Sequence, residues 1–113
     1  MSNADADTIR YGLNKKQLKL ILELIDSFPE IERVFLFGSR ADGTNKVGSD
    51  IDLAIIGHQI TPEILNRFSS GLDDLPLPFM FDVIDYNKIL NNYLKKNIDS
   101  KGKLLFERKL NSV

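Results

Sequence analysis

Apolar residues recur at helical spacing near the start of the chain. Residues 14–28 predict a first amphipathic helix, whose apolar stripe consists of Leu18, Ile21, Leu22, Ile25 and Phe28. Asn14, followed three positions later by Gln17, is typical of a capping box and favours a helix that begins there. Pro29 cannot continue a helix, so the first helix is expected to end before it.

Short apolar runs predict strands at residues 32–37, 50–56 and 79–85, with a short edge strand at 104–106. The run from Val34 to Phe37 is continuously apolar, which is typical of a strand covered on both faces. Residues 42–49 are rich in turn formers and predict a loop, which follows a short helical turn starting at Ser39.

Two more helices follow from the pattern. Thr61, Pro62 and Glu63 form a typical helix start, and the buried stripe behind them is expected to be Ile64, Leu65, Phe68 and Leu72. Asn87 is expected to cap the last helix, whose buried face is predicted to consist of Ile89, Leu90, Tyr93, Leu94 and Ile98.

Helices that alternate with strands predict an α+β fold, in which a small twisted sheet packs against helices. The order of strands in the sheet does not follow from the pattern. Residues 11–108 are expected to form a single domain, between a loose terminus at 1–10 and a polar tail at 109–113. Residues 2–4 (Ser-Asn-Ala) have the form of a cloning remnant.

The composition, with 42% hydrophobic and 27% charged residues among 113, indicates one ordinary globular domain. The formal net charge of −1 and the absence of a basic run argue against direct nucleic-acid binding. The apolar runs are too short to cross a membrane. Because the chain has no cysteine, we expect a cytoplasmic protein without disulfides.

Aspartates on the predicted strands are the strongest chemical signal. Asp50 and Asp52 are two positions apart, so on a strand both side chains point to one face, and Asp82 can join them from a neighbouring strand. Carboxylates among apolar residues are costly to bury unless they are paired or hold a metal, and a set of oxygen ligands favours Mg²⁺ or Mn²⁺. The alternative for each residue taken alone is a carboxylate that caps a strand end or turn.

The turn after the first strand is a candidate anion site. Gly38 lets the backbone approach a phosphate, and the Ser39 hydroxyl and following amides can donate hydrogen bonds to it. The alternative is a plain turn in which Ser39 caps a helix. Arg40 either neutralises phosphate charge or is a solvated surface residue. Asp85 competes with Asp82 as the third carboxylate, but its position at the strand end favours a capping role.

These motifs resemble a known family. Gly38-Ser39, a gap of ten residues and then Asp50-Ile51-Asp52 match the signature of the polymerase-beta-like nucleotidyltransferase superfamily. The strings 37–43 and 48–55 are similar to those of its minimal nucleotidyltransferases, and 81–85 resembles the strand with the third carboxylate. The resemblance, which spans roughly residues 9–108, implies a two-layer nucleotidyltransferase fold with a small mixed sheet, in α-β-α-β-α-β-α order.

The resemblance also implies roles for these residues. Asp50 and Asp52 would bind the metal that accompanies the triphosphate, and Asp82 would join them at a second metal that readies the acceptor hydroxyl. Gly38 and Ser39 would hold the β- and γ-phosphates. The expected cofactors are two Mg²⁺ ions, with Mn²⁺ as a substitute, and the expected nucleotide is ATP or another nucleoside triphosphate.

The family resemblance implies a helical partner of the HEPN or substrate-binding type, encoded nearby, to which AMP would be transferred as in toxin–antitoxin pairs. A homodimer or a heterotetramer is compatible with this expectation. Two alternatives stay open. One is transfer to a small molecule such as an aminoglycoside, and the other is a non-catalytic module that neutralises its partner by contact.

Overall fold

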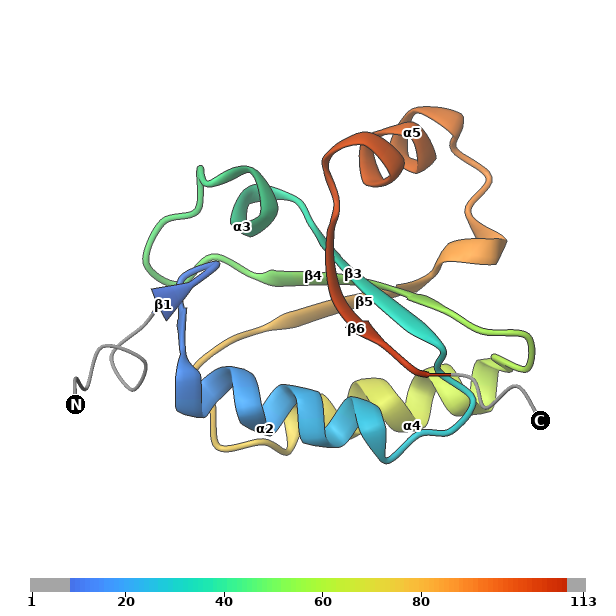
Figure 1. The fold of residues 1–113 in the computed structure, drawn as a ribbon, viewed down its shortest axis with the longest axis horizontal. Helices are drawn as coiled ribbons and strands as arrows, with labels where there is room; N and C mark the ends of the chain where they lie inside the picture. The colour runs from blue at the N-terminus through green and yellow to red at the C-terminus, as the bar shows by residue number, and fades with distance from the viewer. Residues whose placement is uncertain (1–8, 110–113) are drawn as a thin grey trace.

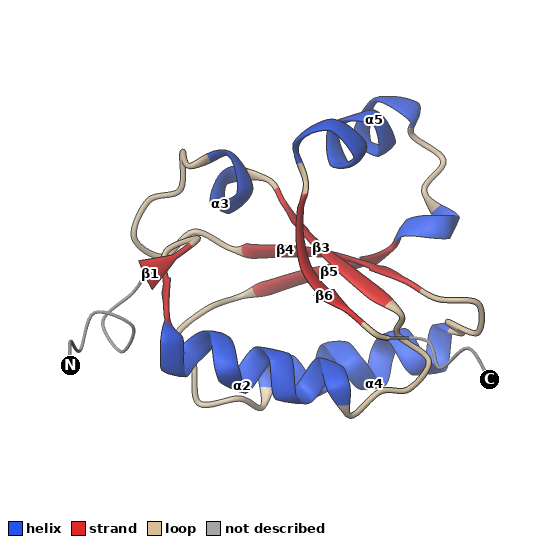
Figure 2. Ribbon diagram, in the orientation of Figure 1, coloured by secondary structure: helices blue, strands red, loops and turns tan. Residues whose placement is uncertain are grey.

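The computed structural model describes residues 9–109 as a four-stranded sheet with helices on both faces (Figure 1). The proposed cloning remnant at 2–4 lies outside these residues. The elements, coloured by type in Figure 2, are β1 Ile9–Arg10, β2 Leu13–Asn14, α2 Lys15–Asp26, β3 Arg33–Phe37, α3 Ser39–Asp42, β4 Ile51–Ile56, α4 Pro62–Asp73, β5 Phe81–Asp85, the 3₁₀ helix Tyr86–Lys88, α5 Asn92–Lys101 and β6 Lys103–Glu107.

The strand order is β5-β4-β3-β6, which the sequence pattern left open. β4 and β5 are parallel, whereas β3 pairs antiparallel with both β4 and β6. The sheet is therefore mixed, and the predicted α+β class is confirmed. The edge strand expected at 104–106 is β6, in which the pairing with β3 shifts register between Val34 and Phe35.

The larger core lies between the sheet and the pair α2 and α4 (Figure 1). Ile21 and Ile25 of α2 and Phe68 of α4 are fully buried there. Each such side chain contributes roughly 1.5 to 3 kcal/mol to stability. The predicted helix starts are confirmed: Asn14 forms the capping box with Gln17, and the Thr61 hydroxyl accepts a hydrogen bond from an amide in the first turn of α4.

A smaller core lies on the opposite face of the sheet, where α5 packs. Phe37, Ala54 and Ile98 are its buried members. Because side chains alternate along a strand, the residues on this face include Asp52 of β4 and Asp82 of β5. The two predicted carboxylates thus border an apolar cluster on the less covered side of the sheet.

The prediction for the last helix was wrong at its start. Asn91, not Asn87, caps α5 through its side chain, and residues 86–88 form a 3₁₀ turn instead. Leu90 is 95% exposed and Tyr93 is 83% exposed, so neither belongs to the buried face. The apolar spacing predicted a helix that starts too early, because spacing alone does not reveal a break between two short helical segments.

The hairpin of β1 and β2 was also missed, because two-residue strands leave no periodic pattern. It pairs Ile9 with Asn14 in an antiparallel register. Its turn places Tyr11 at φ 59° and Gly12 at φ 77°. Residues 9 and 10, expected in a loose terminus, are therefore part of the folded domain. Among residues 9–109, no helix has the length and apolar character needed to span a membrane.

Candidate active site

Asp52 and Asp82 lie directly opposite each other on neighbouring strands. The parallel pairing of β4 with β5 sets Asp52 beside Asp82, and strands in a sheet are about 4.8 Å apart. Both side chains project from the face of the sheet on which α5 packs. The structure therefore brings together the two strand aspartates that the sequence predicted as partners, although they are thirty positions apart in the chain.

Asp50 precedes the first residue of β4 and is exposed. It lies near enough to act electrostatically on Asp52. Burial raises the pKa of the Asp52 carboxyl above its usual range, the carboxylates of Asp82 and Asp50 raise it further, and the Arg40 guanidinium opposes this shift. Asp52 is thus the centre of a cluster of like charges, in which a cation would be stabilised.

Gly38 lies against the carboxylate of Asp52. Its φ of 76° falls in the left-handed region, and a Cβ built on it would collide with Asp52 Oδ2. A glycine is therefore required both by the backbone angle and by the space. The close approach joins the end of β3 to the aspartate of β4.

Ser39 begins α3, but it does not cap this helix. The N-cap position is held by Gly38, and no side chain caps α3. The interpretation of Ser39 as a helix cap is therefore wrong. The predicted contact between Ser39 and a phosphate stays a prediction.

Arg40 is only 3% exposed, so its interpretation as a solvated surface residue is wrong. Its Nε and Nη2 donate to the carbonyl oxygen of Ser49 at 3.1 and 2.7 Å, and its Nη1 donates to that of Tyr11 at 2.9 Å. The guanidinium carbon lies 4.8 Å from the centroid of the Phe79 ring. Burial lowers the pKa of Arg40, and the carboxylates of Asp50 and Asp52 oppose this shift.

Asp85 has the capping role that the sequence favoured. It is 7% exposed, and its Oδ1 accepts a hydrogen bond from the amide of Asn87 at 3.1 Å. It thereby caps the 3₁₀ turn at the end of β5. It shares a strand with Asp82 but is committed to this turn, so Asp82 is the better candidate for chemistry.

The aspartates do not form a finished metal shell. Within residues 9–109, no three carboxylate or imidazole side chains converge closely enough to enclose a metal ion. The donors nevertheless fit a hard divalent cation, because Asp50, Asp52 and Asp82 supply only oxygen ligands and crowd their negative charges.

Tyr11, Gly12 and Phe79 contact Arg40 beside the site and were not selected from the sequence. Tyr11 and Gly12 form a turn between strands too short to be recognised, and Phe79 was taken only as a strand residue. The one signal in the sequence was the glycine at position 12, a residue type that permits the positive φ found there. These contacts depend on chain segments that meet only in the folded protein.

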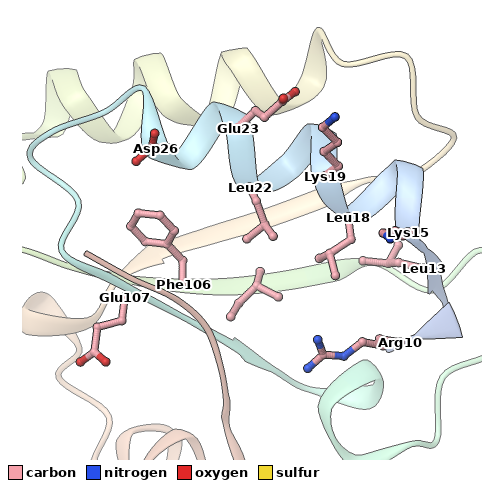
Figure 3. A pocket seen from close by; sticks show the side chains of 11 residues that line it. Arg10, Leu13, Lys15, Leu18, Lys19, Leu22, Glu23, Asp26, Phe106 and Glu107 are labelled. Carbon is pink, nitrogen blue, oxygen red and sulfur yellow. The ribbon is translucent and has the colours of Figure 1, made fainter. Parts of the chain in front are cut away.

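A groove with a volume of about 780 Å³ lies elsewhere, between α2 and β6 (Figure 3). Its floor is apolar and includes Leu18, Leu22 and Phe106. Figure 3 shows charged side chains around the rim, such as Lys15 and Glu107. The groove is on the α2 side of the sheet, so it does not reach the aspartates.

The family described as Polymerase beta, Nucleotidyltransferase matches residues 19–111. Protein adenylyltransferase MntA of Shewanella oneidensis is 33% identical over 60 residues, which cover 49% of this chain and 43% of that protein. The match thus spans less than half the length of this curated relative.

Solved structures show the same fold. A toxin–antitoxin structure with AMP-PNP superposes with a TM-score of 0.60 at 24% identity, covering 81% of this chain and 74% of the other. A structure of the tri-AMPylated Shewanella oneidensis HEPN toxin in complex with MNT antitoxin gives a TM-score of 0.53 at 23% identity, covering 80% and 70%.

Proposed function

The chain belongs to the polymerase beta nucleotidyltransferase family, and from this premise we propose that it transfers AMP from ATP to a hydroxyl of a helical HEPN-type partner protein. The observation that carries the proposal is the register of Asp52 beside Asp82. The glycine-serine turn is held against this pair through the contact of Gly38 with Asp52. The groups proposed to donate hydrogen bonds to the phosphates therefore lie beside the carboxylates.

The reaction divides between two groups of residues. The backbone at Gly38 and the Ser39 hydroxyl hold the β- and γ-phosphates, while Asp50 and Asp52 would hold the cation that accompanies the triphosphate. The acceptor oxygen forms a bond to the α-phosphorus as the bond to pyrophosphate breaks, and the exposed Asp82 carboxylate takes the hydroxyl proton. Divalent cations bound by Asp50, Asp52 and Asp82 would neutralise charge on the acceptor oxygen and on the oxygen of the leaving pyrophosphate.

The names of the relatives support a protein acceptor. MntA of Shewanella oneidensis is named as a protein adenylyltransferase, and the neighbouring structure contains a tri-AMPylated HEPN toxin. In this chain, Val47 and Met80 are strongly exposed apolar residues on the segments that lead into Asp50 and Asp82. Apolar side chains at the mouth of a site favour contact with a protein surface.

Labelled ATP tests the proposal. The chain is purified with the product of the neighbouring gene and incubated with Mg²⁺ and ATP labelled at either the α- or the γ-phosphate. We expect the partner to retain label only from the α position, and we expect Asp52→Asn to abolish it. Asp73→Asn is the matched control, because Asp73 is an exposed aspartate on α4, across the sheet from the site.

The alternatives give other results. Label on an added aminoglycoside, and none on the partner, would replace the protein acceptor with a small molecule. A tight complex that stays unlabelled with wild type and in which Asp52→Asn still neutralises the partner would indicate a non-catalytic module. Label from the γ position would show phosphoryl instead of nucleotidyl transfer.

A further inference from the structure

We propose that Arg40 is a positioning residue that ties the N-terminal hairpin to the loop before Asp50 and so sets the metal-binding carboxylates in place. The proposal rests on the proposed function for what the carboxylates bind. It assigns Arg40 a role through other residues, in place of the phosphate contact expected from the sequence. It also makes the hairpin of β1 and β2 part of the active-site framework.

The contacts of Arg40 join segments distant in sequence. Its two hydrogen bonds to the Ser49 carbonyl hold the residue immediately before Asp50, and its bond to the Tyr11 carbonyl spans 29 positions. Because only a planar guanidinium offers several donors in fixed directions, one arginine can hold both carbonyls at once. Asp50 lies outside β4, so the chain is held on one side of it by the pairing of Ile51 with β5 and on the other side by the contact of Arg40 with Ser49.

The surroundings of the guanidinium are shaped to accept it. A Cβ on Gly12 would lie 2.5 Å from Arg40 Nη1 and 2.7 Å from Asn45 Nδ2, so the hairpin turn fits closely against the guanidinium and the loop. The guanidinium lies over the ring of Phe79, two residues before β5 begins. Arg40 therefore touches the chain on the approach to both strands that carry the aspartates.

Arg108 provides a matched control. It also holds backbone carbonyls, with its Nε bonded to Ile31 and its Nη2 to Asp26 and Phe28, and its Nη1 bonded to the Asp26 carboxylate. These contacts fasten the end of β6 to the segment after α2, away from the aspartates. Loss of Arg108 therefore removes a similar clamp without altering the support of Asp50.

The first experiment compares Arg40→Gln, Arg40→Lys and Arg108→Gln with the wild type. Backbone hydrogen exchange is measured for residues 9–12 and 44–50, and the affinity for Mn²⁺ alone and for ATP alone is measured by titration. We expect Arg40→Gln to speed exchange in both segments and to weaken Mn²⁺ binding roughly ten- to a hundred-fold, as for other residues that orient metal ligands. Arg40→Lys should recover only part of the loss, and Arg108→Gln none of the effect.

Gly12→Ala tests the clamp from its other side and keeps the charge of Arg40. Its added Cβ displaces the guanidinium, so Mn²⁺ binding should weaken, whereas Gly43→Ala should leave it unchanged. Gly43 is a suitable control because it has a φ of 84°, close to that of Gly12, but no atom within 4 Å of an added Cβ. This variant keeps the proposal open to test if Arg40→Gln does not fold.

Several results would overturn the proposal. Equal Mn²⁺ affinity and equal loop exchange in Arg40→Gln and Arg108→Gln would show that Arg40 only stabilises the fold. A loss of ATP affinity with unchanged Mn²⁺ affinity and exchange would assign Arg40 to the phosphate. If the wild type transfers no label, the proposed function fails, and exchange in residues 44–50 still decides whether Arg40 positions the loop.

Discussion

The carboxylate of Asp52 lies against Gly38 so closely that no side chain fits between them. This contact joins the turn proposed to hold the phosphates to an aspartate proposed to hold their metal. It exists because β3 and β4 pair antiparallel, with Phe37 opposite Asp52, so that the turn after one strand meets the start of the other.

Gly38→Ala should therefore abolish nucleotidyl transfer. The substitution forces an alanine to a φ of 76° and drives Asp52 out of place, at a cost of roughly 1 to 3 kcal/mol in the free energy of unfolding. Thermal unfolding and the α-label assay measure the two effects. Gly43→Ala carries a similar backbone cost at a φ of 84° without the collision, and it should keep its activity.

Asp52→Asn should stabilise the protein while it removes activity. Burial and the carboxylates of Asp82 and Asp50 disfavour the charged form of Asp52, so loss of that charge should raise the free energy of unfolding. Chemical denaturation without metal measures the gain. A clear loss of stability would show instead that Asp52 is a structural carboxylate.

The stability gain of Asp52→Asn should depend on pH. Because the pKa of Asp52 is raised in the folded protein, the unfavourable contribution is fully present above that pKa and disappears as the pH falls toward the unfolded value near 3.8. The difference between the wild type and Asp52→Asn should therefore shrink on acidification. A difference that grows as the pH is lowered would contradict the raised pKa.

Added Mg²⁺ should reverse the order of stability. An ion that binds only the folded protein should raise the melting temperature of the wild type as its concentration increases, roughly with the logarithm of that concentration. Asp52→Asn should show little rise, and chelation should return the wild type to its original melting temperature. Equal shifts in both proteins would place the ion elsewhere.

Asp82→Ala and Asp85→Ala should have opposite effects. Asp82 is proposed to take the hydroxyl proton, so its loss should abolish transfer. Because Asp82 is exposed, its loss should leave the free energy of unfolding nearly unchanged. Asp85 caps the turn after β5, so its loss should cost about 1 kcal/mol and leave the activity per folded molecule intact. Denaturation curves, together with label incorporation per folded molecule, separate these outcomes.

Ser39→Ala should weaken the use of ATP without weakening the fold. No side chain caps α3, so the change in the free energy of unfolding should stay within about 0.5 kcal/mol. Loss of one hydrogen bond to phosphate should raise the KM for ATP roughly five- to ten-fold. An unchanged KM would exclude Ser39 from the phosphate site.

The sequence by itself determined most of the fold's elements and the candidate chemistry. Helical spacing and caps such as Asn14 and Thr61 act within a few residues, so they can be read locally. The spacing of Asp50 and Asp52 after Gly38-Ser39 likewise selects a site from adjacent residues. The start of α5 was misplaced because exposed Leu90 and Tyr93 have the spacing of a buried face.

Only the tertiary structure decided which distant segments of the chain lie next to each other. The parallel pairing that sets Asp82 next to Asp52, and the burial of Arg40 between Tyr11 and Ser49, depend on contacts between distant segments. The sequence pattern records whether a residue prefers the interior, but it does not record which segment packs against it. An arginine that appears solvated in the sequence can therefore be buried, because backbone carbonyls that meet only on folding satisfy its donors.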